Sequence, residues 1–253
     1  MSDSVNRTSS LIPPGGSGDA TVLPAQQAKA VVDPTNWPIV AARDSLPPVD
    51  PQRLSVPALR QRFADAGDWK PELFGDPIRA KQPGLRDAAV LVPIVMHDHG
   101  STVLLTERTA TLSSHAGQVA FPGGRRDPED PSAASTALRE AEEEVGLARE
   151  YVEVIGHLPE YLTGTGYRVT PVVALVRPQF TLTLQTFEVA EAFEVPLSFL
   201  MDPAHHQVRR MMYSGAERTF YAMPYRPTPV DREYFIWGAT AAMLRNLYRF
   251  LSA

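Results

Sequence analysis

The sequence predicts an α/β (α+β) fold in which helices cover both sides of a mixed β-sheet. Apolar segments of strand length are interleaved with helical patterns, but they do not alternate strictly, as they would in a regular parallel array. The chain has 253 residues, of which 43% are hydrophobic and 21% are charged, a balance typical of a globular protein. A chain of this length can bury a large core without disulfides or structural metals.

Proline marks the N-terminal part of the chain. The sequence holds 24 prolines, nearly twice the usual share of about 5%, and 11 of them precede Ile78. The first 20 residues are polar and are expected to be disordered, because they offer too little apolar surface to offset chain entropy. Residues 21–53 include Trp37 and Ile39 and are expected to dock on the domain as an arm, or to bind a partner. We therefore divide the chain into a Pro-rich tail and arm, 1–53, and a domain, 54–253.

The elements of the domain follow from apolar periodicity and capping residues. The first helix is expected to start at Ser55, a capping residue, and to end at Gly67. The apolar run 88–96 predicts a buried strand, and a hairpin turn then leads to a return strand at 102–106. The other expected elements are strands near 118–121, 152–155, 168–176, 181–184, 207–213 and 218–222, a short helix or turn at 195–201, and a closing helix at 239–251.

A second helix is predicted from Pro131 to Val145. Asp130 is a favourable N-cap residue, and Pro131 suits the first helical position. Gly146 suits the left-handed residue after the last turn, and Leu147 can fold back on the helix. At about 100° per residue, the side expected to face the core carries Ala134, Leu138, Ala141 and Val145.

Three carboxylates gather on another face of this helix, at Glu140, Glu143 and Glu144. They repel one another, and the helix dipole disfavours negative charge in the last turns. They form either a solvated acidic face or a site for a hard divalent cation, which prefers oxygen ligands. Arg139 is then either a surface ion pair or a group that orients a ligating carboxylate. Gly123 and Gly124, just upstream, indicate a strand-ending turn or a close approach of the backbone to phosphate or metal.

At these residues the chain resembles a known family. The segment REAEEEVGL, residues 139–147, resembles the core of the Nudix box, R-E-(apolar)-x-E-E-x-G-(apolar). The front half departs from the box, because Asp130 stands where Glu is usual and one extra residue lies between it and Arg139. The same lengthening is found in one branch of the family, the coenzyme A pyrophosphatases. The resemblance implies a Nudix-type α/β/α sandwich.

A second motif supports that branch. LLTER at 104–108, Gly117 and FPGG at 121–124 resemble the coenzyme A signature LLTxR…G…FPGG. Two positions depart from it: Thr109 stands where Ser or Ala is usual, and Ser113 stands where Arg is common. The resemblance implies hydrolysis of the diphosphate bond of coenzyme A or an acyl-coenzyme A. The products would be 3′,5′-ADP and 4′-phosphopantetheine or its acyl form.

The resemblance also assigns residues to roles. Mg²⁺ or Mn²⁺ would be held by Glu140, Glu143, Glu144 and the backbone of Gly124, while Arg139 and Glu143 belong to the catalytic group. The general base is one of the helix carboxylates or a carboxylate from a later, loop-like stretch, Glu188 or Glu191. Substrate contacts are expected from Arg108, His115, Gly117, Gly123 and Arg125, with Arg126 and Arg168 as further cations near the anionic substrate. The alternative for His115 is that it only satisfies a turn.

Composition excludes several classes of function for this protein. The net charge of −5 argues against a nucleic-acid binder that works by bulk charge, and no nucleic-acid partner is expected. The absence of cysteine excludes disulfides, a cysteine nucleophile and Cys-ligated metals. No secretory signal or membrane span is visible, so we expect a cytoplasmic enzyme with no membrane partner. The alternatives are a Nudix hydrolase of ADP-ribose or NADH and a regulator that binds a nucleotide without cleaving it. The sequence leaves the oligomeric state open, with a homodimer as the candidate assembly.

Overall fold

The structure is a computed structural model that describes residues 33–42, 46–75, 83–110, 116–213, 216–229 and 232–253. The chain divides into two compact units, Met1–Pro34 and Thr35–Ala253, and the fold given below is that of the second. The first 20 residues, which we predicted to be disordered, lie outside the described residues. Part of the predicted arm forms strand β1 (Ile39–Ala42), so the folded unit starts before residue 54.

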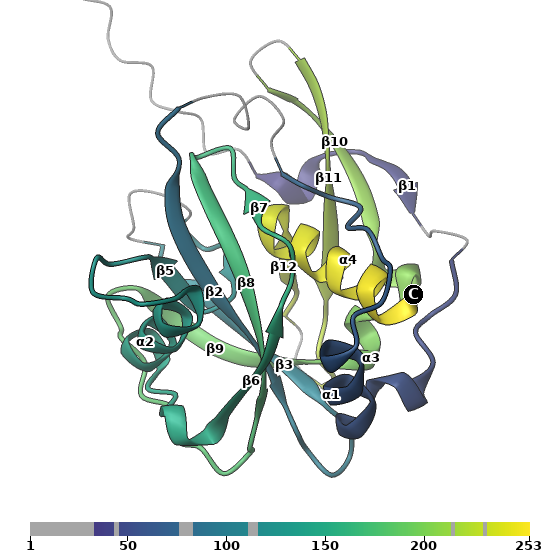
Figure 1. Cartoon of the computed structure of the whole chain (residues 1–253). Coiled ribbons are helices and arrows are strands. Elements are labelled where there is room, and N and C mark those ends of the chain that lie inside the picture. The colour runs from purple at the N-terminus through teal and green to yellow at the C-terminus, as the bar shows by residue number, and fades with distance from the viewer. Residues whose placement is uncertain (1–32, 43–45, 76–82, 111–115, 214–215, 230–231) are drawn as a thin grey trace, which may run out of the picture. The chain divides into compact units, whose positions relative to one another are not determined.

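The larger of two sheets carries the core of the fold (Figure 1). Its central strands, β2 (Arg86–Val95) and β8 (Tyr167–Val176), pair in parallel over their whole length. The other strands of this sheet pair antiparallel with their neighbours, as the predicted mixed sheet requires. They are β3 (Thr102–Arg108), β4 (Val119–Ala120), β5 (Gly123–Arg125), β6 (Val152–His157), β7 (Tyr161–Leu162) and β9 (Val189–Pro196).

The smaller sheet has the order β1–β10–β11–β12 among the described residues. Strand β10 (Gln207–Tyr213) has the predicted bounds, and β11 (Ala216–Tyr225) extends beyond the predicted strand at both ends. We did not predict β1 or β12 (Tyr234–Trp237) as strands. A run of four residues is too short to establish a two-residue period, so only pairing with β10 and β11 defines these two strands.

The predicted helices are present. They are α1 (Val56–Ala64), α2 (Ala133–Val145), α3 (Leu197–Leu200) and α4 (Gly238–Ser252). Helix α1 ends at Ala64, three residues before Gly67, and the Ser55 hydroxyl donates to the carbonyl of Gln52 instead of capping the helix. Short 3-10 segments lie at Pro34–Asn36, Pro51–Leu54, Arg149–Tyr151 and Pro203–His205. No helix in the described part of the chain is long and apolar enough to cross a membrane.

The large sheet is covered on both faces, as predicted. Along β2, Val92 and Ile94 belong to a core shared with α1 and α4, whereas Leu91 and Val95 belong to a second core shared with α2. This division follows from the two-residue period of a strand, which sends successive side chains to opposite faces. Helix α2 therefore covers one face, while α4 packs between the large sheet and the small one (Figure 1).

A buried polar network joins α4 to the rest of the unit. Arg245, 1% exposed, donates from Nε to Glu72 Oε2 at 2.9 Å. Its Nη1 donates to His206 Nδ1 at 3.2 Å, so the His206 ring is neutral and donates from Nε2 to the carbonyl of Leu200 at 2.8 Å. Burial, together with the Arg245 charge, lowers the pKa of His206 to about 4.

This pKa predicts a dependence of stability on pH. The unfolded chain binds a proton at His206 near pH 6.5, and the folded chain does so only near pH 4, so the free energy of unfolding falls as pH is lowered between these values. One pKa unit corresponds to about 1.4 kcal/mol, so the loss approaches roughly 3 kcal/mol at the acid end. Urea unfolding of the wild type and of His206→Gln from pH 7 to pH 4 isolates this contribution. The same slope in both proteins would contradict the buried neutral ring.

Candidate active site

The N-terminus of α2 differs from the prediction. The N-cap is Ser132, whose Oγ accepts from the backbone N–H of Ser135 at 3.1 Å. Asp130, the predicted cap, is buried and binds the guanidinium of Arg139 at 3.2 Å to Nε and 2.8 Å to Nη2. This bidentate, charge-assisted pair is stronger than a single capping hydrogen bond. The hydrogen bonds from Arg139 hold the pKa of Asp130 well below its usual range.

The C-terminus of α2 has the predicted form. Gly146 adopts the left-handed conformation at φ 71°. The backbone N–H of Leu147 donates to the carbonyl of Ala141 at 3.3 Å, and the Leu147 side chain is buried. This closing bond and its apolar contact are the usual end of a helix at glycine.

The segment 181–184, predicted as a strand, is not one. The N–H of Thr183 donates to the carbonyl of Val145 at 2.9 Å, and the N–H of Gln185 donates to the carbonyl of Glu144 at 2.8 Å. These donors satisfy two carbonyls at the end of α2, which have no partner within the helix. The segment therefore caps α2 and ties its C-terminus to the start of β9.

The buried side of α2 is rotated relative to the prediction. Ala141 and Val145 are buried as expected, but Ala134 and Leu138 are only partly buried. Ala137, Thr136 and Glu144 are buried in their place. Strand β5 packs against the helix, so the buried side of the helix includes Glu144.

Glu144 is a carboxylate in an apolar setting, 6% exposed. Its Oε2 accepts from the N–H of Gly123 at 3.0 Å, and its Oε1 lies 3.8 Å from Nη1 of Arg108. Burial raises the pKa of Glu144 to about 7, and the nearby charges of Glu140 and Glu188 act in the same direction. Nε of Arg108 is buried without a hydrogen-bond partner among the described residues. The ion pair between Arg108 and Glu144 is thus at the long end of the range for such contacts.

Glycine is required beside Glu140. A Cβ at Gly124 would lie 2.5 Å from the carboxyl carbon of Glu140, so only glycine leaves room for this carboxylate. A Cβ at Gly123 would lie 2.5 Å from the carbonyl oxygen of Ala89, because β5 approaches β2 closely there. The two glycines therefore serve a close approach of backbone and carboxylate. Burial raises the pKa of Glu140, although Arg139 opposes this effect.

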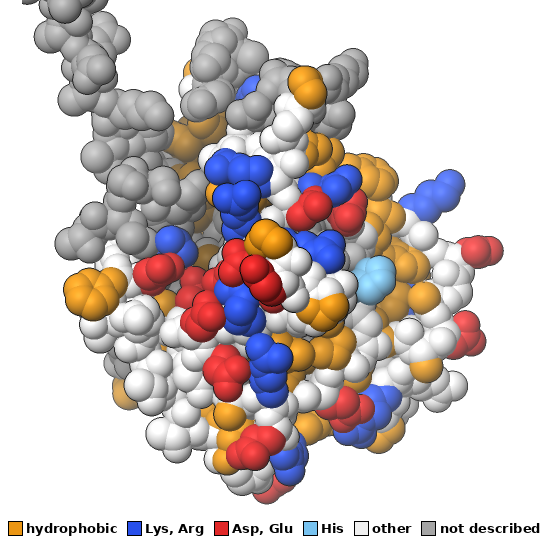
Figure 2. Space-filling model, turned by 60° about the vertical axis from the view of Figure 1, so that its left-hand side comes forward, with side chains coloured by type: hydrophobic (Ala, Val, Ile, Leu, Met, Phe, Trp, Pro, Cys, Tyr) orange, Lys and Arg blue, Asp and Glu red, His pale blue; other side chains and the backbone are white. Residues whose placement is uncertain are grey.

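Arg139 binds two of the three helix carboxylates. Its Nη1 donates to Glu140 Oε1 at 2.9 Å and to Glu143 Oε2 at 3.0 Å, and its Nη2 donates to the carbonyl of Arg125 at 3.1 Å. Its hydrogen bonds to Asp130 and Glu140 raise the pKa of the guanidinium. Acidic and basic side chains are interleaved on the face that includes α2 (Figure 2). Arg139 orients Glu140 and Glu143, one of the two roles the sequence allowed.

The helix carboxylates have the donor chemistry for a hard divalent cation. In the part of the chain that the structure describes, no three acidic or histidine side chains converge into a complete metal site. Glu140 and Glu143 are held by Arg139, whereas Glu144 faces Gly123. Still, all donors are oxygens on adjoining turns, the carboxylate of Glu144 is buried, and Glu140 rests against Gly124. The chemistry of these side chains therefore fits such a cation.

The two candidate bases from the later stretch have different surroundings. Glu188 is exposed at the end of a turn and lies near enough to Glu144 to raise the pKa of that carboxyl. Glu191 lies in β9, not in a loop, and binds Arg232 and the hydroxyl of Tyr234. Glu188 therefore lies near a helix carboxylate, whereas Glu191 is held by an ion pair and a hydrogen bond within the described residues.

The remaining predicted substrate residues are scattered around this site. The N–H of Gly117, at φ 68°, donates to the carbonyl of Arg108 at 3.1 Å and so closes the loop after β3. Arg125 is exposed and contributes its carbonyl to Arg139. His115 lies outside the described residues.

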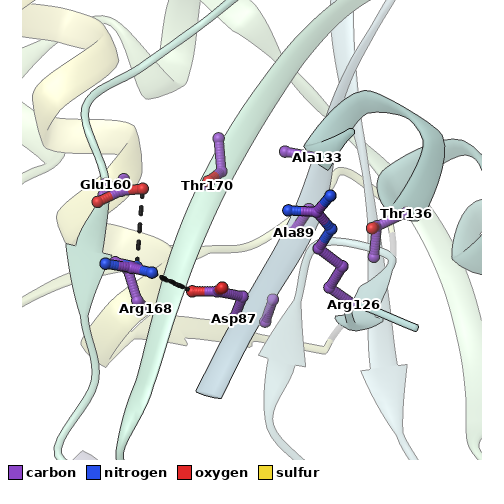
Figure 3. Close-up of a pocket in the computed structure, with 9 residues that line it drawn as sticks. Asp87, Ala89, Arg126, Ala133, Thr136, Glu160, Arg168 and Thr170 are labelled. Carbon is purple, nitrogen blue, oxygen red and sulfur yellow. Dashed lines mark hydrogen bonds and ion pairs between the residues drawn. The ribbon is translucent and has the colours of Figure 1, made fainter. Parts of the chain in front are cut away.

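Arg126 and Arg168 both line a pocket of about 190 Å³ (Figure 3). It lies between the first residues of β2 and β8 and the first turns of α2. Arg168 binds Asp87 at 2.7 Å and lies 3.8 Å from Glu160, while Arg126 donates from Nη2 to the carbonyl of Asp130 at 3.0 Å. Both cations are already bound to protein oxygens in this pocket.

Asp130 is the site residue whose role sequence reasoning missed. Its position in the Nudix box is acidic, which was the available signal, but its good capping propensity predicted a different role. The cluster of Arg232, Tyr234, Glu191 and Glu107 carried no local signal. Its members come from three strands and a loop that only the folded chain brings together.

The contact between Gly124 and Glu140 yields a prediction for metal binding. In Gly124→Ala the added methyl group displaces the end of a flexible side chain, so the free energy of unfolding should change by less than about 1 kcal/mol. The affinity for Mn²⁺, measured by electron paramagnetic resonance, should fall about tenfold because the carboxylate of Glu140 moves. Unchanged Mn²⁺ affinity would remove Glu140 from the metal site.

Comparisons with known proteins show the family to which this chain belongs. Residues 85–215 match the family described as NUDIX domain. A protein of Photorhabdus laumondii subsp. laumondii, "Uncharacterized Nudix hydrolase NudL", is 44% identical over 162 residues, which cover 64% of this chain and 83% of the relative. The protein of that name from Escherichia coli (strain K12) is 42% identical over 162 residues, which cover 64% and 81%. The solved "Nudix Hydrolase from M. Smegmatis, RenU" is 28% identical, with a TM-score of 0.39 over 45% of this chain and 72% of that one.

Proposed function

Because the chain belongs to the Nudix family and is a hydrolase of a nucleoside diphosphate derivative, we propose that its substrate is coenzyme A or an acyl-coenzyme A. The products are 3′,5′-ADP and 4′-phosphopantetheine or its acyl form. We further propose Mg²⁺ or Mn²⁺ as the cofactor, a cytoplasmic location, and no nucleic-acid or membrane partner.

One observation carries the choice of coenzyme A. The two segments that resemble the coenzyme A signature lie on different strands, yet both reach the same helix carboxylate. Arg108 ends the first segment and lies 3.8 Å from Glu144, and Gly123 of the second segment donates to Glu144 at 3.0 Å. The signature is thus one cluster in space, next to the Nudix helix, as a substrate-recognition element requires.

The residues around this cluster divide the work of binding and hydrolysis. Glu140, Glu143 and Glu144 would hold the divalent cation, with the backbone of Gly124 beside them. When bound, that cation neutralises diphosphate charge and makes water more acidic. Arg108 and Arg125 supply positive charge toward the anionic substrate, and Arg139 keeps Glu140 and Glu143 in place.

Glu188 is the proposed general base. In the reaction a water oxygen forms a bond to one phosphorus of the diphosphate, and the bridging P–O bond breaks. Glu188 accepts a proton from that water, and the departing phosphate keeps the electron pair of the broken bond. Its exposed carboxylate beside Glu144 suits this role, whereas Glu191 is engaged by Arg232 and Tyr234.

A substrate panel tests the proposal. With Mg²⁺ present, coenzyme A should release 3′,5′-ADP on anion-exchange chromatography faster than ADP-ribose or NADH is cleaved. Cleavage of ADP-ribose with intact coenzyme A would replace the proposed substrate with the alternative one. Binding without cleavage of any nucleotide would indicate a regulator.

Substitutions on and near α2 separate the proposed roles. Glu143→Gln and Glu144→Gln should each lower kcat by about 100-fold or more and weaken Mn²⁺ binding. Glu188→Gln should lower kcat to a similar degree while Mn²⁺ binding stays intact. Glu142→Gln is the matched control, because the Glu142 side chain is exposed on the same helix and bonds only to Arg149 among the described residues, at 3.2 Å. Rates within about threefold of wild type for both ligand variants would refute the metal-ligand assignment.

A further inference from the structure

The turn that carries Glu188 also exposes an aromatic ring. Phe187 is 80% exposed, the highest value among the exposed large hydrophobic side chains of the described residues. Most of this ring lies in water, so its burial contributes little to the stability of the fold. The described residues thus leave the ring available to a ligand.

The turn is anchored on both sides of the candidate site. On one side, the N–H of Gln185 donates to the carbonyl of Glu144 at 2.8 Å. On the other side, Thr109 donates from its N–H to the carbonyl of Glu188 and from Oγ1 to the carbonyl of Phe187, both at 2.9 Å. Thr109 follows Arg108, the last residue of β3, so the turn connects the C-terminus of α2 to the end of β3.

These anchors give Thr109 a role that the sequence did not reveal. Its position departs from the signature, where Ser or Ala is usual. In the structure its hydroxyl fixes the backbone of Phe187, which an alanine could not do. Hydrogen bonds thus hold the backbone on both sides of Phe187. Phe187 directly precedes Glu188 and lies two residues after Gln185, which contacts Glu144.

We propose that Phe187 is a stacking platform for the nucleobase of the substrate. The cation Arg108 is suited to the diphosphate, which the neighbouring carboxylates would meet only through a divalent cation. A nucleoside diphosphate also carries a flat base that needs an apolar surface. Aromatic rings stack on bases of any sequence, because every base presents a π-face. The inference rests on the family's action on nucleoside diphosphate derivatives and not on the choice of coenzyme A.

The test compares two probes that differ by the nucleoside. ADP carries a base and inorganic pyrophosphate does not, and both are titrated with Mg²⁺ by isothermal titration calorimetry. Phe187→Ala should weaken ADP binding about tenfold, equivalent to about 1.4 kcal/mol, and change pyrophosphate binding by less than twofold. Phe187→Trp should keep ADP affinity within threefold of wild type, since the larger ring also stacks. In hydrolysis assays the alanine variant should show the loss in KM and not in kcat.

Phe74 provides a matched control. It is 62% exposed and lies in another part of the chain, where its carbonyl accepts from the N–H of Leu162 at 3.1 Å. Phe74→Ala should leave both affinities at the wild-type value. Equal losses for ADP and pyrophosphate in Phe187→Ala, an ADP affinity within twofold of wild type, or a wild-type protein that binds no ADP would each overturn the platform. A selective ADP loss in an enzyme that does not cleave coenzyme A would instead refute only the proposed substrate.

Discussion

The guanidinium of Arg139 is the interaction on which the candidate site depends. Its Nε and Nη2 donate to the buried carboxylate of Asp130. Its Nη1 donates to both Glu140 and Glu143. The first contact closes the loop between β5 and α2, and the second orients the carboxylates on the helix. Because Asp130 is buried, removing Arg139 would leave the charge of Asp130 without the guanidinium that compensates it. Loop closure and carboxylate orientation are therefore a single electrostatic unit.

Close packing of β5 against α2 gives the site its second property. The glycines at 123 and 124 let the backbone lie against β2 and against the Glu140 carboxylate, and the same approach buries Glu144. Burial raises the pKa of this carboxylate, and the charge of Arg108 only partly opposes the effect. Such an arrangement costs stability, because burial disfavours the charged form of the carboxylate.

The rest of the fold holds these parts in place from a distance. The large sheet is buried on both faces, so α2 rests on a rigid layer whose other side is packed by α1 and α4. The turn at 185–188 links the C-terminus of α2 to Thr109 and β9, which brings three distant segments to one edge of the site. Away from the site, the buried Arg245 of α4 bonds to the neutral His206, which lies just before β10 and bonds to Leu200 of α3. These connections are tertiary, and each depends on residues far apart in sequence.

Local patterns in the sequence determined the mixed sheet, the central strands, the helix from its carboxylates to Gly146, and the Nudix resemblance, because periodicity, helix ends and motif spacing are properties of neighbouring residues. The tertiary structure alone decided that Asp130 pairs with Arg139 instead of capping α2, that residues 181–184 cap this helix instead of forming a strand, and that Glu191 is engaged while Glu188 is exposed. It also decided that the short runs at β1 and β12 become strands. In each case a long-range partner offers a stronger bond or a complete ladder, and no local propensity encodes where that partner lies.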